Sequence, residues 1–214
     1  MESTMANYGV IDLGSNSVRL VIFDVKDGIS KKKPITCKDF RSIINDKVMA
    51  GLSAYVEAGE FTQEGIARAV DVLSGHLKRA RYFNCVRTDI FATAVLRNCT
   101  NSRRAIRAIE EAIGTPVNLL SARDEAHLSF AGASCDRTID KGTVVDLGGG
   151  STELIRVEEG RDFDDVSIGQ GSLSSYAGYV EFVMPQADEV EAIERAFLER
   201  VAETPVDLRK YRAE

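Results

Sequence analysis

Two short segments of the sequence carry acidic, small and hydroxyl-bearing residues at the same spacing. DLGSNSVRL begins at Asp12, and DLGGGSTEL begins at Asp146, 134 positions later. A Gly- and Ser-rich turn between two strands leaves several backbone N–H groups pointing into one concavity, where they can bind a phosphate. The aspartate beside each turn would repel that phosphate unless a cation such as Mg²⁺ lay between them. The repeat therefore predicts two phosphate-binding turns, each beside a metal-binding carboxylate.

The residues at the two turns have either no side chain or a small polar one. The aspartates beside these turns, Asp12 and Asp146, offer hard oxygen ligands, which favour magnesium, with manganese also possible. A single Gly/Ser hairpin is typical of a purely structural turn, whereas two matching copies favour phosphate binding. The predicted phosphate-binding residues are Gly14, Ser15, Asn16, Ser17, Gly148, Gly149, Gly150, Ser151 and Thr152.

Apolar runs precede and follow each turn, and they predict the strands that hold it. Each second run ends in an acidic residue and a glycine, Asp27-Gly28 in the first copy and Glu159-Gly160 in the second. Such a pair is a strong signal for a tight β-hairpin turn. Each copy is therefore expected to form three consecutive strands.

The rest of the sequence predicts alternating helices and strands. Thr62 can cap one helix, and a second helix starts at Ser102 and ends at Gly114. The pattern of three strands begins again at Gly142, so a mixed sheet with helices on its faces, formed twice, is the economical architecture. The other expected elements are a strand over 34–44, a strand over 86–92, a polar loop over 93–101, a strand over 117–120, a helix over 122–133 and a helical pattern over 173–203 that is broken at Pro185.

Composition and charge exclude several classes of protein. The chain has 214 residues, of which 44% are hydrophobic and 28% are charged, as in ordinary globular proteins. No apolar stretch is long enough to span a bilayer and no signal-peptide pattern is present, so a cytoplasmic protein without a membrane partner is expected. The net charge is −6 and aromatic residues are sparse, which disfavours a nucleic-acid partner.

Charge is distributed unevenly along the chain. Residues 1–123 carry 18 Lys and Arg against 13 Asp and Glu, whereas residues 124–214 carry 9 against 20. This asymmetry indicates either an anionic ligand that is approached from the first half or a simple drift of surface charge. Arg103, Arg104 and Arg107 are open to the same two interpretations, as a basic path for a long polyanion or as scattered surface arginines.

Four motifs together resemble those of one enzyme family. In chain order, IDLGSNSVRLVIF, FATAVLR, LLSARDEAHLSF and VVDLGGGSTELI resemble the exopolyphosphatase / guanosine pentaphosphate phosphohydrolase (Ppx/GppA phosphatase) family, within the actin/hexokinase/heat-shock-protein ATPase superfamily. The resemblance covers almost the whole chain. It implies an α/β, ribonuclease H-like or actin-like ATPase fold made of duplicated βββαβαβα domains, with the active site in the interdomain cleft. The domains expected from it are residues 7–123 and a partial copy over residues 124–214.

The resemblance also implies a reaction and its residues. The expected reaction is magnesium-dependent removal of terminal orthophosphate from inorganic polyphosphate, or from guanosine pentaphosphate to give guanosine tetraphosphate. Glu125 matches the family's water-activating base, Arg97 matches an arginine that binds phosphate, and Glu153 resembles a carboxylate implicated with the metal. Without the resemblance, the acids at 124 and 125 could merely stabilise a helix N-terminus, and Arg97 could be an exposed loop residue. Arg19 is not assigned, because strand alternation could point it away from the site.

Two other functions are alternatives, and one of them is disfavoured. An actin-like kinase needs a Gly-rich adenosine pocket late in its second domain, and no glycine follows Gly178. In the family that these motifs resemble, the second domain continues further than this chain does. The second sheet is therefore expected to be incomplete, as in a fragment, a short natural form or a degraded copy, and pairing as a homodimer is possible. A non-catalytic phosphate or nucleotide sensor is the remaining alternative.

Overall fold

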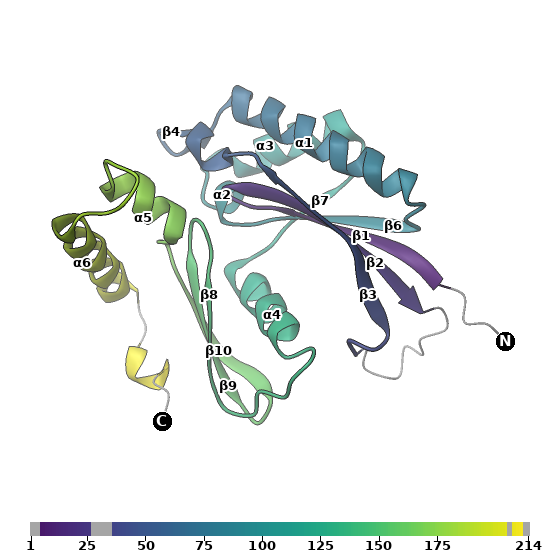
Figure 1. The fold of residues 1–214 in the computed structure, drawn as a ribbon. Helices are drawn as coiled ribbons and strands as arrows, with labels where there is room; N and C mark the ends of the chain where they lie inside the picture. The colour runs from purple at the N-terminus through teal and green to yellow at the C-terminus, as the bar shows by residue number, and fades with distance from the viewer. Residues whose placement is uncertain (1–4, 27–35, 205–206, 212–214) are drawn as a thin grey trace. The chain divides into compact units, whose positions relative to one another are not determined.

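The computed structural model describes residues 5–26, 36–204 and 207–211. Contacts within the chain define two compact units, residues 1–120 and residues 121–214, and each is described here by itself (Figure 1). The boundary expected after residue 123 would fall inside a helix of the second unit. The expected Asp27-Gly28 turn lies outside the described residues.

Unit 1 is built on a five-stranded mixed sheet with the strand order β3-β2-β1-β6-β7. The first three strands are antiparallel neighbours, whereas β6 runs parallel to β1 and β7 runs parallel to β6. Parallel neighbours of this kind require crossover connections, which here contain helices. The strands are β1 (Met5–Leu13), β2 (Ser17–Lys26), β3 (Phe40–Met49), β6 (Arg87–Ala92) and β7 (Val117–Leu119).

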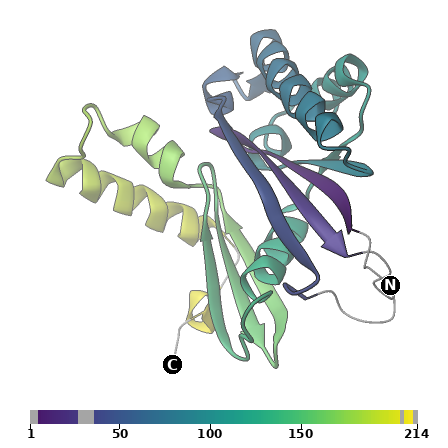
Figure 2. The ribbon, with the colours of Figure 1, turned by 45° about the vertical axis from the view of Figure 1, so that its right-hand side comes forward.

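Helices cover one face of this sheet, as Figures 1 and 2 show. Alternate residues of β1 and β2 are fully buried against them, including Ile11, Leu13 and Leu20. The helix predicted from its cap begins as expected, because the Thr62 hydroxyl accepts a hydrogen bond from the Gly65 amide at 3.1 Å. The helices and small elements of this unit are η1 (Leu52–Tyr55), β4 (Val56–Glu57), β5 (Glu60–Phe61), α1 (Gln63–Tyr82), α2 (Ala94–Arg97) and α3 (Ser102–Ile113).

Two expectations for unit 1 were wrong in detail. The third strand runs over Phe40–Met49, later than the expected residues 34–44. The expected loop over residues 93–101 contains the helical turn α2, because Val95 and Leu96 are buried in the core of the unit. A segment of four residues is too short for hydrophobic periodicity to reveal a helix.

Unit 2 begins with α4 (Ala122–Ala133), which packs on a three-stranded antiparallel sheet of order β10-β9-β8. Ala126 and Phe130 of the helix form a small core with Ile155 and Val157 of the sheet. The two helices expected around Pro185 are present, and α4 covers the predicted residues. The other elements are β8 (Gly142–Leu147), β9 (Thr152–Glu158), β10 (Arg161–Ile168), α5 (Ser172–Tyr179), α6 (Ala187–Glu203) and η2 (Leu208–Tyr211).

The second sheet contains fewer strands than the first. Within the described residues, β8 pairs with β9 alone, whereas β1, its counterpart in the repeat, pairs with both β2 and β6. Val145 and Leu147 of β8 are 58% and 62% exposed. The described part of unit 2 therefore reproduces the three antiparallel strands of unit 1 without counterparts of β6 and β7.

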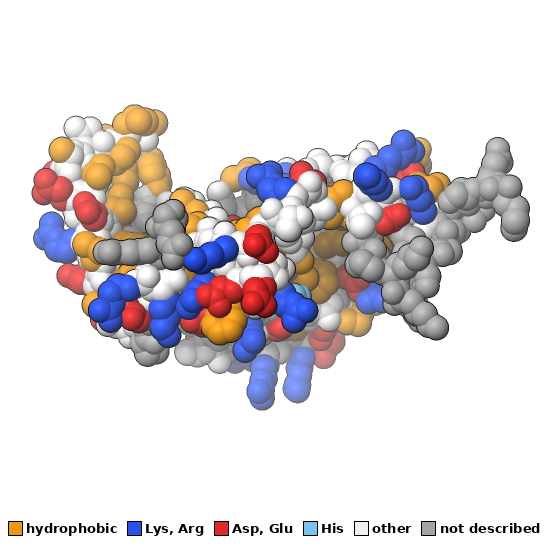
Figure 3. Space-filling view, turned by 90° about the horizontal axis from the view of Figure 1, so that it is seen from below, with side chains coloured by type: hydrophobic (Ala, Val, Ile, Leu, Met, Phe, Trp, Pro, Cys, Tyr) orange, Lys and Arg blue, Asp and Glu red, His pale blue; other side chains and the backbone are white. Residues whose placement is uncertain are grey.

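The surface shows charges of both signs. On the face seen in Figure 3, acidic and basic side chains lie intermixed, and neither sign forms an extended patch. Among the described helices, none is both long enough and apolar enough to cross a membrane.

Candidate active site

The two repeated turns close with the same hydrogen bond. In unit 1 the Gly14 amide donates to the Ser17 carbonyl at 3.1 Å, and in unit 2 the Gly148 amide donates to the Ser151 carbonyl at 3.0 Å. A Cβ atom added to Gly14 or Gly148 would meet that same carbonyl oxygen at 3.1 or 3.2 Å. The sequence repeat is therefore a repeat of backbone geometry as well as of residue types.

The carbonyl groups of the first turn are bound by the segment that follows β3. Ser15 accepts a hydrogen bond from the Ser53 amide at 2.8 Å, and Asn16 accepts bonds from the amides of Ala50 and Gly51 at 2.9 and 2.8 Å. In a trans peptide, the C=O of one residue and the N–H of the next point in opposite directions. The amides of Asn16 and Ser17 therefore point away from this segment, as a phosphate-binding turn requires.

The second turn is held in the same way by the beginning of α5. The amides of Ser172 and Leu173 donate to the carbonyls of Gly148 and Gly149, both at 2.9 Å. By the same peptide geometry, the amides of Gly149 and Gly150 point away from α5. Both turns thus present successive N–H groups on the side opposite to their supporting segment, with little side chain in the way.

A row of polar side chains crosses the sheet of unit 2 beside its turn. Asp146 of β8 lies directly opposite Glu153 of β9, which lies opposite Ser167 of β10. Paired residues of neighbouring strands share one face of a sheet. Ser129 of α4 donates a hydrogen bond of 2.5 Å to Asp146 Oδ2, so this is the face that α4 covers. Glu125 lies one helical turn before Ser129, on the same side of α4.

Glu153 is the most buried carboxylate of the row, with 1% exposure. Burial is the main cause that raises the pKa of Glu153, and the nearby charges of Glu125 and Asp146 raise it further. Hydrogen bonds from Ser151 and Ser167 act in the opposite direction. This effect of Glu125 on Glu153 indicates that α4 brings Glu125 close to the carboxylates of the sheet, as its position one turn before Ser129 also requires. A buried carboxylate with a perturbed pKa beside two other acids is typical of a functional site.

Glu153 is expected to reduce the stability of the folded chain at neutral pH. Because its pKa is raised on folding, the folded state binds its proton more tightly, and stability falls as the pH rises through the interval from the ordinary value to the raised one. Glu153→Gln should therefore raise the Tm at neutral pH by a few degrees, roughly 1 kcal/mol. Thermal unfolding without divalent cations checks this, and the gain should vanish at acidic pH. A variant that is less stable at neutral pH would contradict the cost assigned to the buried carboxylate.

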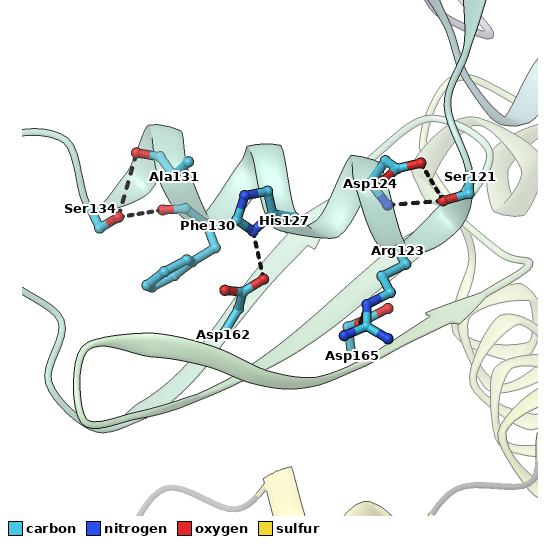
Figure 4. A network of polar contacts seen from close by, with 9 residues as sticks. All are labelled: Ser121, Arg123, Asp124, His127, Phe130, Ala131, Ser134, Asp162 and Asp165. Carbon is cyan, nitrogen blue, oxygen red and sulfur yellow. Dashed lines mark hydrogen bonds and ion pairs between the residues drawn. The ribbon is translucent and has the colours of Figure 1, made fainter. Parts of the chain in front are cut away.

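The two adjacent acids of α4 have different roles in the structure, and Figure 4 shows Asp124 beside Ser121 at the start of the helix. The Ser121 hydroxyl accepts a hydrogen bond from the Asp124 amide at 3.1 Å and donates one to Asp124 Oδ2 at 2.6 Å. That hydroxyl donor is the main cause that lowers the pKa of Asp124. Asp124 is therefore part of the helix cap, as the alternative interpretation expected, while Glu125 lies near the other carboxylates.

Two polar contacts hold α4 against β10. His127 Nδ1 lies 2.7 Å from Asp162 Oδ2, and Arg123 Nε lies 4.0 Å from Asp165 Oδ1, as Figure 4 shows. The positions 123 and 127 are one helical turn apart, so both contacts lie along one side of the helix. They connect the helix that carries Glu125 to the strand that carries Ser167.

The residues predicted in unit 1 lie at the ends of β1 and α2. Asp12 is exposed on the sheet face opposite the core, and its carboxylate would lie 3.9 Å from a Cβ atom at Gly14. Arg97 ends α2 and donates from Nη1 to the Leu120 carbonyl at 3.2 Å. Arg19, which sequence analysis left unassigned, pairs with Asp12 across β1 and β2 and is also exposed. Strand alternation therefore places Arg19 on the same face as Asp12.

Some predicted side chains have other partners. Thr152 is 4% exposed, and its hydroxyl donates to the Gln170 carbonyl at 2.7 Å. The Ser151 hydroxyl is engaged with Glu153. The hydroxyl of Thr152 therefore anchors β9, and the phosphate contacts of Thr152 and Ser151 stay predictions.

The carboxylates suit a hard cation held partly through water. Among the described residues, no group of three or more His, Cys, Asp or Glu side chains is arranged to hold a metal ion directly. Magnesium, however, commonly keeps several waters and is bound by one or two carboxylates together with substrate phosphates. Glu153, buried near two other acids, is the kind of oxygen donor whose charge such a cation would stabilise.

The chain is similar to proteins of one family. The family model described as the Ppx/GppA phosphatase family matches residues 21–212. A Haemophilus influenzae protein named as a candidate exopolyphosphatase is 30% identical over 151 residues, which cover 68% of this chain and 42% of that protein. This chain therefore spans less than half the length of that relative.

Solved structures show a similar fold. A crystal structure of an exopolyphosphatase from Cytophaga hutchinsonii has a TM-score of 0.77 at 22% identity, covering 92% of this chain and 61% of that one. The Ppx/GppA family member of Aquifex aeolicus has a TM-score of 0.70 at 22% identity, covering 95% of this chain and 65% of that one. At this level of identity the likeness establishes the fold alone.

Proposed function

The chain belongs to the Ppx/GppA phosphatase family, and from this membership together with the carboxylate row of unit 2 we propose that it is a phosphohydrolase. The proposed reaction releases orthophosphate from the end of inorganic polyphosphate, or from guanosine pentaphosphate to give guanosine tetraphosphate. The observation that carries the proposal is the placement of Glu125 by α4 beside Asp146 and Glu153, while the neighbouring Asp124 is used as a helix cap.

Glu125 is the proposed general base. Its carboxylate would take a proton from a water molecule while the water oxygen forms a bond to the terminal phosphorus. The bridging P–O bond breaks, and its electron pair leaves with the shortened polyphosphate or the tetraphosphate.

The turns and Arg97 are the proposed phosphate-binding groups. The amides of Asn16 and Ser17 in unit 1, and those of Gly149 and Gly150 in unit 2, can donate to phosphate oxygens. Arg97 has a planar, permanently charged donor that also suits phosphate oxygens. Asp146 and Glu153, and Asp12 beside the first turn, are the proposed magnesium ligands, directly or through water. A bound magnesium ion supplies positive charge that neutralises the phosphate oxygens.

The proposal is tested by orthophosphate release from both substrates, with magnesium and after chelation by EDTA. Release should occur with at least one substrate and should fall by about a hundredfold or more when the metal is removed. Manganese should restore it. Release that is unaffected by chelation would contradict the role of the metal. A chain that binds polyphosphate with magnesium but releases no orthophosphate would instead be a phosphate-binding protein.

A further inference from the structure

Three arginines lie together on α3. Arg103, Arg104 and Arg107 are all exposed, and with Ala108 and Glu111 they line an open hollow of about 460 Å³. Positions 103, 104 and 107 fall on one side of a helix, because residues three and four apart are neighbours on its surface. We call this patch the α3 arginine surface.

These arginines are placed where helix electrostatics disfavours them. They lie in the first two turns of α3, near the positive end of the helix dipole, and the first turn contains no acidic residue. Asn101, at the cap position, makes no side-chain cap bond, because its amide group pairs with the backbone of Phe61 through two bonds of 2.9 Å. The cluster is therefore a cost to the folded chain that an anion would relieve.

Compensation by acidic side chains is partial. Arg104 pairs with Glu60 of β5 at 3.3 Å, and both side chains are more than half exposed. Within the described part of the chain, neither Arg103 nor Arg107 forms an ion pair. An exposed pair such as Arg104 and Glu60 contributes little to stability. The guanidinium groups of Arg103 and Arg107 are thus available to an external anion.

The α3 arginine surface is connected to the first turn within unit 1. The Ser53 amide of η1 donates to the Ser15 carbonyl of the turn at 2.8 Å. The β4–β5 hairpin follows η1 directly, and its Gly59 carbonyl accepts from the Thr100 amide at 2.9 Å, just before α3. The turn, the hairpin and the beginning of α3 therefore lie at the same end of unit 1.

We propose that the α3 arginine surface binds the distal phosphates of a linear polyphosphate whose end is bound at the first turn. This inference rests on the proposed function and adds that the affinity of the site depends on the length of the polyphosphate chain. A long chain of phosphates extends past the groups that bind its end, whereas a short one does not. Once the end of a long chain is bound, its distal phosphates are at a high effective concentration near a second basic surface on the same unit. That surface therefore adds affinity for long chains only. Guanidinium forks match phosphate oxygens along such a chain.

The test compares polyphosphate binding by Arg103→Gln/Arg107→Gln with a matched control, Lys78→Gln/Arg81→Gln. The control removes two exposed cations from the last turns of α1. Every protein carries Glu125→Gln so that the chain is not consumed, and calorimetry gives the Kd for long-chain polyphosphate and for tripolyphosphate at low salt. The arginine variant should weaken long-chain binding by about tenfold and tripolyphosphate binding by less than about twofold. The control should change both by less than about twofold.

Four outcomes would overturn the inference. Long-chain binding could be unchanged, both lengths could weaken equally, or the control could weaken long-chain binding as much. Single-stranded DNA that binds as tightly as polyphosphate, with the same loss in the arginine variant, would show a general polyanion surface and also overturn it. Because the Kd is measured without turnover, failure of the hydrolase proposal leaves this test intact. Equal Tm values for the variants verify that both fold.

Discussion

Glu125→Gln is expected to lower kcat for orthophosphate release by about a hundredfold or more, with little change in the affinity for polyphosphate. Glutamine preserves the size of the side chain but cannot accept a proton from water at neutral pH. The carboxylate of Glu125 lies near Asp146 and Glu153, so the substitution also removes one negative charge from the cluster. Removing that charge should leave phosphate binding equal or slightly stronger. Steady-state kinetics and a separate Kd measurement distinguish the two effects.

Asp124→Asn is the matched control, because it makes the same chemical change at the adjacent position of α4. Asp124 is exposed and is hydrogen-bonded to Ser121, and asparagine can keep that cap. Its kcat should stay within about threefold of the wild type, since the residue belongs to the helix cap. If Asp124→Asn loses as much activity as Glu125→Gln, or if Glu125→Gln keeps full activity, the base has been assigned to the wrong residue.

Gly171→Ala is expected to disrupt the second phosphate-binding turn. A Cβ atom at this position would lie 2.5 Å from the Gly148 carbonyl oxygen, 2.6 Å from the Gly149 carbonyl carbon and 2.7 Å from the Ser151 nitrogen. All three are backbone atoms of the turn, so no side-chain rotation can make room. The substitution should cost about 1–3 kcal/mol in stability. Displacement of the turn should lower kcat/KM for polyphosphate by about a hundredfold.

Gly178→Ala, within the helix α5 that follows Gly171, controls for the change of residue type. Nothing lies within 4 Å of a Cβ atom at Gly178, and alanine is the better helix former. This variant should be as stable as the wild type or slightly more stable, with unchanged kcat/KM. Wild-type stability and turnover in Gly171→Ala would show that the turn can move freely, which would contradict its role as a preorganised phosphate site.

The sequence predicted the elements whose structure depends on residues close together in the chain. The two turns, the Thr62 cap and the α4 helix over residues 122–133 are specified by neighbouring residues, and the structure contains all of them. The α2 turn was missed because its burial depends on the packing of the unit, which periodicity over four residues does not report.

The missed residues of the candidate site depend on contacts between distant segments. Gly171 packs against the turn at Gly148, although the strands β9 and β10 separate the two in the sequence. The residues next to Gly171 in the sequence do not indicate this contact. Ser129 contacts Asp146 through the packing of α4 on the sheet. Arg19 could have been placed by counting from Asp12 through the hairpin, since antiparallel pairing puts partners on one face. The sequence analysis did not work out the pairing register of this hairpin, which sets Arg19 opposite Asp12.

The most direct test of the proposed hydrolysis is to let the chain act on polyphosphate with magnesium in heavy-oxygen water and to analyse the released orthophosphate by mass spectrometry. Attack by a water molecule activated by Glu125 predicts that each orthophosphate carries a single heavy oxygen atom, and that the labelled product is lost in Glu125→Gln. Orthophosphate without the label, phosphate transferred to another acceptor, or no product at all from the wild-type chain would contradict the account.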